Sequence, residues 1–134
     1  MSEAANLAIH AGALAAANEG PGYLSVKQMA RVLEVSRSHL AKVLQGLART
    51  GLMESVRGAS GGYRLARPAE GISLLELLEA VDGRAGARAC LLGRAICRRG
   101  QCVLGELSER VAEAVRDSLG QTSLAEFVRR QARK

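Results

Sequence analysis

The chain has 134 residues, of which 48% are hydrophobic and 2% are aromatic, a length and composition that suit one compact domain with an appended arm. So few aromatic side chains favour close-packed helices over a large sheet, which predicts a mainly α fold. The net charge of +6 favours a polyanionic partner, whereas no run approaches the roughly 18 apolar residues of a transmembrane helix, so we expect a cytoplasmic protein.

Capping residues and helical spacing predict three helices in the first part of the chain. The first covers residues 5–18 and is followed by a Gly-Pro-Gly breaker. The second covers residues 25–33, because a Ser-x-x-Gln capping box opens it. The third begins after the N-cap Ser36 and ends at Gly51. It carries one apolar stripe at helical spacing: Leu40, Val43, Leu44 and Leu47.

The second and third predicted helices are joined by a short turn, which is the layout of a helix-turn-helix reader of DNA. Basic residues are concentrated here, since residues 25–67 contain eight Lys or Arg and two acidic residues. The side chains near the start of the third helix are expected to contact the major groove: Arg37, Ser38, His39 and Lys42. Of these, Ser38 and His39 are the expected base readers, while Lys27 or Arg31 would contact phosphates.

A β-hairpin is predicted next, with strands at 52–57 and 63–66 around the glycine-rich loop 58–62. A helix-turn-helix followed by such a hairpin makes a winged helix. An arginine on the wing can enter a narrow minor groove, and Arg57 is the candidate for that contact.

Two more helices and a tail are predicted in the second half of the chain. A capping box at Ser73–Glu76 opens a helix that stops at Gly83, and another at Ser123–Glu126 opens a short tail helix. Between them a long amphipathic helix carries an apolar stripe: Leu104, Leu107, Val111, Val115 and Leu119. The stripe packs either within the chain or against a second copy. A two-fold dimer on a palindromic site favours the second copy, because one recognition helix reads only a few base pairs.

Three cysteines lie within thirteen residues at a C-x6-C-x4-C spacing: Cys90, Cys97 and Cys102. Five arginines and no acid lie between residues 84 and 102, which favours deprotonated thiols. Thiolates are soft ligands that suit zinc, copper(I) and iron–sulfur clusters. A metal-free thiol–disulfide switch remains the alternative, and so do three structural cysteines. A redox enzyme is disfavoured because the segment has neither a Cys-x-x-Cys pair nor a histidine.

The wing sequence from Arg57 to Ala66, the helix end Ala80-Val-Asp-Gly83 and the three-cysteine segment together resemble a known bacterial family. The chain resembles the Rrf2 family of transcription regulators from about residue 4 to residue 127. Some members of this family carry an iron–sulfur cluster. The resemblance implies a mainly α fold with a winged helix-turn-helix domain, a small β-hairpin wing and a long C-terminal dimerisation helix.

The resemblance further implies a homodimer on double-stranded DNA and a cluster held by Cys90, Cys97 and Cys102, of the 2Fe-2S rather than the 4Fe-4S type. A fourth, non-cysteine ligand comes in some members from the N-terminal helix of the partner subunit. The candidates here are His10, Glu3 and Asn6. An imidazole nitrogen binds iron, which favours His10, and the alternative is a half-buried helix histidine with no ligand role. The spacing of six and four residues departs from the family, whose cysteines are often about five apart.

The expected organisation is therefore a DNA-binding domain at residues 1–83, a cluster-binding loop at 84–102, and a dimerisation helix with tail at 103–134. The expected function is a transcription regulator, not an enzyme. An iron–sulfur cluster that senses redox state, nitric oxide or iron status would control its affinity for a palindromic operator, and the alternative is control by a metal-free cysteine switch.

Overall fold

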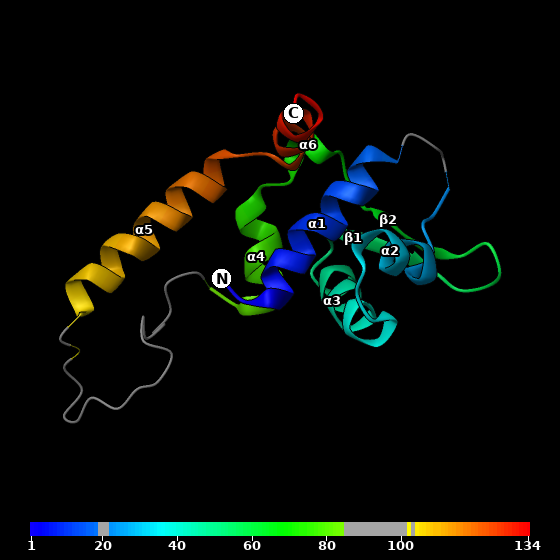
Figure 1. Ribbon diagram of the computed structural model, residues 1–134, viewed down its shortest axis with the longest axis horizontal. Helices are drawn as coiled ribbons and strands as arrows, with labels where there is room; N and C mark the ends of the chain where they lie inside the picture. The colour runs from blue at the N-terminus through cyan, green and yellow to red at the C-terminus, as the bar shows by residue number, and fades with distance from the viewer. Residues whose placement is uncertain (19–21, 85–101, 103) are drawn as a thin grey trace.

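The structure, a computed structural model, describes residues 1–18, 22–84, 102 and 104–134. Within these residues the fold is mainly helical, with one small antiparallel sheet (Figure 1). The α-helices are α1 (Glu3–Ala17), α2 (Val26–Leu33), α3 (Arg37–Arg49), α4 (Leu74–Asp82), α5 (Gly105–Gln121) and α6 (Leu124–Ala132). The strands are β1 (Met53–Val56) and β2 (Gly62–Leu65), and a short 3-10 helix, η1, covers Ala69–Gly71.

The predicted helix starts are confirmed where a capping serine was recognised. Ser25 and Gln28 form the reciprocal capping box of α2, and the Ser36 hydroxyl accepts a hydrogen bond from the His39 backbone amide at the start of α3. The first helix begins two residues earlier than predicted, because the Ser2 hydroxyl accepts a hydrogen bond from the Ala5 amide. The turn between α2 and α3 is tight, with Glu34 in the left-handed region at φ 55°.

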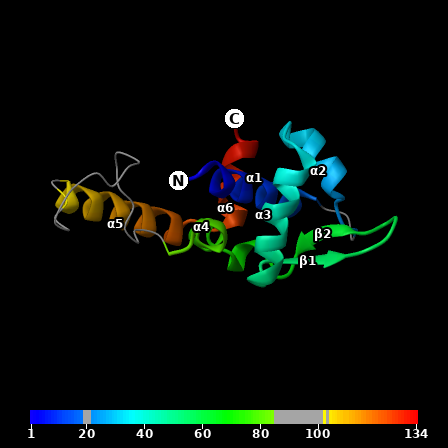
Figure 2. The ribbon, with the colours of Figure 1, turned by 90° about the horizontal axis from the view of Figure 1, so that it is seen from below.

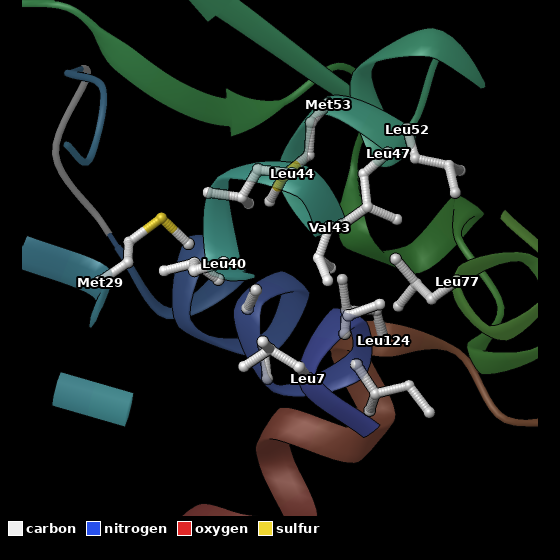
Figure 3. Close-up of a cluster of buried hydrophobic side chains, with 14 of the residues drawn as sticks. Leu7, Met29, Leu40, Val43, Leu44, Leu47, Leu52, Met53, Leu77 and Leu124 are labelled. Atoms are coloured by element: carbon white, nitrogen blue, oxygen red, sulfur yellow. The ribbon is translucent and has the colours of Figure 1, made fainter. Parts of the chain in front are cut away.

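Helix α1 is the centre of the fold. It contacts α2, α3, α4, α6 and β2, and seven of its residues are buried. Figure 3 shows side chains from several helices converging beside it, among them Leu7, Leu40, Val43, Leu44, Leu47, Leu77 and Leu124. The predicted stripe of α3 is buried in this core, so the opposite face of α3 is left at the surface.

Helix α6 returns to the core, although the sequence suggested only a short tail helix. Leu124 is fully buried, and its backbone amide donates a 2.8 Å hydrogen bond to the Ile72 carbonyl just before α4. The predicted capping box at Ser123–Glu126 is half formed. The Ser123 hydroxyl caps the Glu126 amide, but the Glu126 carboxylate pairs with Arg130 instead of reaching back.

Helix α5 projects away from the rest of the fold (Figures 1 and 2). None of its residues is buried, and among the helices and strands its main contact is α4. Val115 and Leu119 pack beside Leu75 and Leu78 of α4, whereas Leu107 and Val111 remain 43% and 41% exposed. The half of α5 nearer Gly105 therefore presents an apolar surface that the described part of the chain does not cover.

Candidate functional site

The exposed face of α3 carries the predicted major-groove residues. Arg37, Ser38 and Lys42 are exposed, and the leucines and valine on the opposite face are anchored in the core. Lys27 and Arg31 are exposed on α2, the preceding helix of the helix-turn-helix. The structure thus brings five basic or polar candidates to the surface on two adjacent helices.

His39 differs from its neighbours on α3. Its side chain is half-buried, and its Nε2 atom is buried without a hydrogen-bond partner among the described residues. A buried ring nitrogen does not face a DNA groove, so this burial favours Ser38 over His39 as a base reader.

The wing is the hairpin of β1 and β2, in which Met53 pairs with Leu65 and Val56 with Gly62. It extends from the side of the fold beside α3 (Figure 2). Arg57 is exposed directly after β1, at the start of the loop. The wing therefore offers Arg57 to solvent, as the minor-groove role requires.

The base of the wing is fixed by a second arginine. The Arg64 guanidinium donates a 2.9 Å hydrogen bond to the Glu54 carboxylate and lies 4.6 Å from the centre of the Tyr23 ring. The hydrogen bond to Glu54, with Tyr23, raises the pKa of Arg64 above its ordinary value. Arg64 is therefore engaged within the protein.

Two glycines allow the wing to approach its neighbours closely. A Cβ on Gly62, at φ +150°, would lie 2.1 Å from the Leu24 carbonyl oxygen, and one on Gly61 would lie 2.1 Å from the Val56 oxygen. This approach lets Leu24 and Tyr63 exchange two backbone hydrogen bonds of 2.9 and 2.8 Å. The wing is thereby attached to the segment that enters α2.

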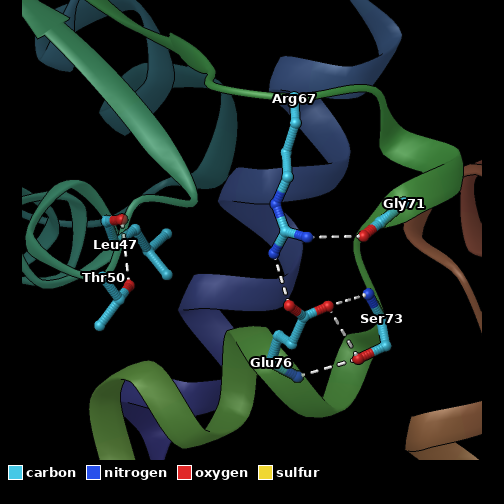
Figure 4. A network of polar contacts seen from close by, with 6 residues as sticks. All are labelled: Leu47, Thr50, Arg67, Gly71, Ser73 and Glu76. Carbon is cyan, nitrogen blue, oxygen red and sulfur yellow. Dashed lines mark hydrogen bonds and ion pairs between the residues drawn. The ribbon is translucent and has the colours of Figure 1, made fainter.

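A polar network connects the chain after the wing to α4 (Figure 4). Arg67 donates to the Gly71 carbonyl at 3.0 Å and to the Glu76 carboxylate at 2.5 Å, while Glu76 also accepts from the Ser73 amide. Burial raises the pKa of Glu76, but the Ser73 amide and the Arg67 guanidinium outweigh it, so the pKa lies below its ordinary value. The network places the wing and α4 in one connected unit.

The structure describes one of the three predicted cysteine ligands. Cys90 and Cys97 lie outside the described residues, while Cys102 is exposed and its carbonyl accepts a 3.0 Å hydrogen bond from the amide of Gly105, the first residue of α5. Within the described ranges, no group of three or more His, Cys, Asp or Glu side chains lies close enough to hold a metal ion. The structure therefore leaves the three-cysteine site as a prediction.

The N-terminal candidates for the fourth ligand share one exposed face of α1. Glu3, Asn6 and His10 are all exposed and lie one turn apart along the helix. The Nδ1 atom of His10 donates a 2.9 Å hydrogen bond to the Asn6 carbonyl. The imidazole ring packs edge to face against the Phe127 ring, with 6.1 Å between the ring centroids. A carbonyl only accepts, so Nδ1 carries the proton and a neutral ring presents the lone pair of Nε2.

A further contact joins the start of α1 to the end of α4, where the cysteine segment begins. The Ser2 amide donates a 3.1 Å hydrogen bond to the Asp82 carboxylate, and the Ser2 hydroxyl donates to its other oxygen. Sequence reasoning missed this contact and the Arg67–Glu76 pair. Ser2 and Asp82 are 80 positions apart, so no local sequence pattern predicts their contact.

A family model described as an iron-dependent transcriptional regulator, Rrf2, matches residues 1–130. The chain belongs to the Rrf2 family. It is 33% identical to the HTH-type transcriptional regulator IscR of Cereibacter sphaeroides over 121 residues, covering 88% of this chain and 78% of that protein. It is 37% identical to IscR of Xenorhabdus nematophila over 98 residues, covering 72% of this chain and 59% of that protein.

Solved structures of Rrf2 regulators have the same fold. Staphylococcus aureus CymR matches with a TM-score of 0.74 and 29% identity, covering 95% of this chain and 96% of that one. The IscR of T. potens matches with a TM-score of 0.75 at 24% identity, covering 98% and 87%. The predicted winged-helix fold is confirmed, and the chain is a DNA-binding transcription regulator, not an enzyme. No helix among the described residues is both long and apolar enough to cross a membrane.

Proposed function

We propose that this Rrf2 protein is a homodimer that binds a palindromic operator through α3 and the wing, and that an iron–sulfur cluster controls its affinity for that DNA. One observation carries the proposal. A winged helix with exposed polar and basic side chains on α3 is joined, through α4, to a segment that holds three cysteines. A DNA-reading surface and a set of soft metal ligands are thus parts of one small protein.

The exposure of the candidate side chains supports the proposed DNA contacts. Ser38 reads a base edge in the major groove, Arg37 and Lys42 flank it, and Arg57 enters the minor groove from the wing. Lys27 and Arg31 on α2 contact phosphates, which fixes the register of the protein on DNA.

The apolar face of α5 supports the dimer. Leu107 and Val111 are exposed on a helix that projects from the fold, and a second copy of the same helix would cover them. Leu107→Glu is expected to convert the dimer to a monomer in analytical ultracentrifugation. The matched control is Val32→Glu on α2, which is 63% exposed and should leave the dimer intact. A dimer that survives both Leu107→Glu and Val111→Glu would contradict this interface.

The donor set fits an iron–sulfur cluster. Cys90, Cys97 and Cys102 supply three thiolates, and His10 of the partner subunit supplies the fourth ligand through Nε2, whose lone pair the hydrogen bond to Asn6 leaves free. When bound, the cluster supplies a redox-active and nitric-oxide-reactive group. The arginines of the segment balance the negative charge of the thiolates.

Helix α4 connects the cysteine segment to the DNA-binding surface. It contacts α1 and α3, its start is tied to Arg67 after the wing, and its end is tied to Ser2. A change in the cysteine segment that moves the end of α4 therefore acts on the recognition helix and the wing together. A difference of about 3 kcal/mol between two such arrangements changes DNA affinity more than a hundredfold.

Visible absorption, iron and acid-labile sulfide of anaerobically purified protein test the cluster. We expect a brown protein with iron and sulfide, a loss of both in Cys102→Ser, and an altered spectrum in His10→Ala but not in Glu3→Gln. An altered spectrum in Glu3→Gln alone would assign the fourth ligand to Glu3. A colourless wild-type protein that remains free of iron after reconstitution would refute the cluster.

A metal-free thiol switch is the second candidate. The solved structures similar to this chain include an oxidised form of Staphylococcus aureus CymR, 29% identical with a TM-score of 0.74, and Cys102 is exposed here. This candidate predicts a colourless protein whose intact mass falls by two hydrogens on oxidation, with a parallel change in DNA affinity. Unchanged mass and affinity after oxidant treatment would exclude it.

A further inference from the structure

The exposed face of α3 extends well beyond the residues near its start. Four polar residues follow one another at spacings of four, three and four positions, which places them on a single face of the helix. They are Ser38, Lys42, Gln45 and Arg49, and all four are exposed. The buried residues of α3 lie on the opposite side, so this face is free to enter a groove.

Gln45 is the residue of this face whose side chain can both donate and accept hydrogen bonds in a planar arrangement. In the described part of the protein, the side-chain hydrogen bonds at the ends of α3 are made by Ser36 and Thr50. The Gln45 amide makes no hydrogen bond there and is free to contact DNA. An amide matches the N7 acceptor and N6 donor of adenine in the major groove, whereas Lys42 and Arg49 on either side only donate, which suits the O6 and N7 acceptors of guanine or a phosphate.

The spacing along the helix suits a second reading position. Gln45 lies seven residues after Ser38, which is about 10.5 Å along the helix axis at 1.5 Å per residue. With base pairs stacked about 3.4 Å apart, the two side chains can reach bases up to about three base pairs apart.

We propose that Gln45 is a specificity-determining residue that reads an adenine in each half of the operator through a bidentate contact in the major groove. The proposal rests on the proposed function, since it assumes that α3 enters the major groove. It adds a second base reader to Ser38, one that the sequence did not single out.

Selection from a pool of randomised DNA duplexes tests the proposal and requires no defined operator sequence. Full-length wild-type protein and Gln45→Ala are taken through the same selection, both as purified anaerobically and after removal of iron. We expect the wild type to enrich a two-fold symmetric sequence, and Gln45→Ala to lose the preference for adenine at one position of each half. Affinity for the wild-type sequence should fall about 5- to 150-fold, equivalent to about 1–3 kcal/mol, with an unchanged salt dependence.

Two further variants test whether the contact is specific to the Gln45 side chain. Gln45→Glu should shift the preference at that position toward cytosine, whose N4 amino group donates to a carboxylate. Gln131→Ala is the matched control, because Gln131 is an exposed amide on α6, across α1 from α3, and should select the wild-type sequence (Figure 1). Alanine is the best helix former, so circular dichroism should show Gln45→Ala fully folded.

The outcomes separate this assignment from the proposed function. Identical selected sequences for wild type and Gln45→Ala would overturn the reading role while leaving the regulator intact. An equal loss on all sequences with a shallower salt dependence would assign Gln45 to a phosphate and would also overturn it. A wild-type protein that enriches no sequence in either state would overturn both the function and the assignment.

Discussion

The wing is attached to the segment before α2 at Gly62, a position that has no room for a side chain. In Gly62→Ala the new Cβ would lie 2.1 Å from the Leu24 carbonyl oxygen, which is far inside van der Waals contact with a backbone atom that a rotamer change does not relieve. The two hydrogen bonds between Leu24 and Tyr63 must therefore open. Each of these hydrogen bonds contributes about 0.5–1.5 kcal/mol, and the alanine also strains the backbone at its positive φ. We therefore expect the unfolding free energy of Gly62→Ala to be about 2–4 kcal/mol below that of the wild type.

Urea unfolding followed by circular dichroism measures this loss, with two glycines as controls. Gly71→Ala meets no atom within 4 Å and should change stability by less than about 0.5 kcal/mol. Gly58→Ala is equally open but has φ +116°, so it should cost about 1 kcal/mol. The variant Gly62→Ala should also bind selected DNA more weakly, because the wing loses its fixed position. If Gly62→Ala were as stable as Gly71→Ala, the close-approach argument would be wrong.

Three other predictions concern Arg57 on the wing, the Arg67–Glu76 ion pair and the hydrophobic core. Arg57→Ala should weaken binding to selected DNA by about 1–3 kcal/mol in fluorescence anisotropy, whereas Arg133→Ala at the end of α6 should not; equal affinities for both variants would exclude the wing contact. The folded-state pKa of Glu76 is depressed, so its contribution to stability is present above the ordinary value of 4.5 and is lost as the pH falls through the folded value. Glu76→Gln should therefore lower stability at pH 7 and flatten the acid limb of the stability–pH curve, and a parallel curve would contradict the pair. Leu77→Ala, at a fully buried position, should cost about 2–5 kcal/mol in urea unfolding, against less than about 0.5 for Val32→Ala at an exposed one.

Local signals determined most of the secondary structure. Ser25 with Gln28, Ser36 and Ser73 with Glu76 fixed helix starts through hydrogen bonds that span three residues, and such short-range bonds can be read directly from the order of amino acids. Helical spacing likewise identified the buried face of α3, since the side chains of one face recur every three or four positions. The candidate DNA-binding residues followed from that face and from the concentration of basic residues.

Tertiary structure decided which of those side chains are free to act. The crossing of α3 with its neighbours buries the Nε2 atom of His39 while leaving Ser38 and Gln45 exposed, and spacing along the helix does not show that this ring nitrogen is enclosed. The return of α6 onto α1 and the contact of Ser2 with Asp82 join residues far apart in the chain. Such contacts depend on how helices pack in space, because burial is a property of the whole core and not of any segment that forms it.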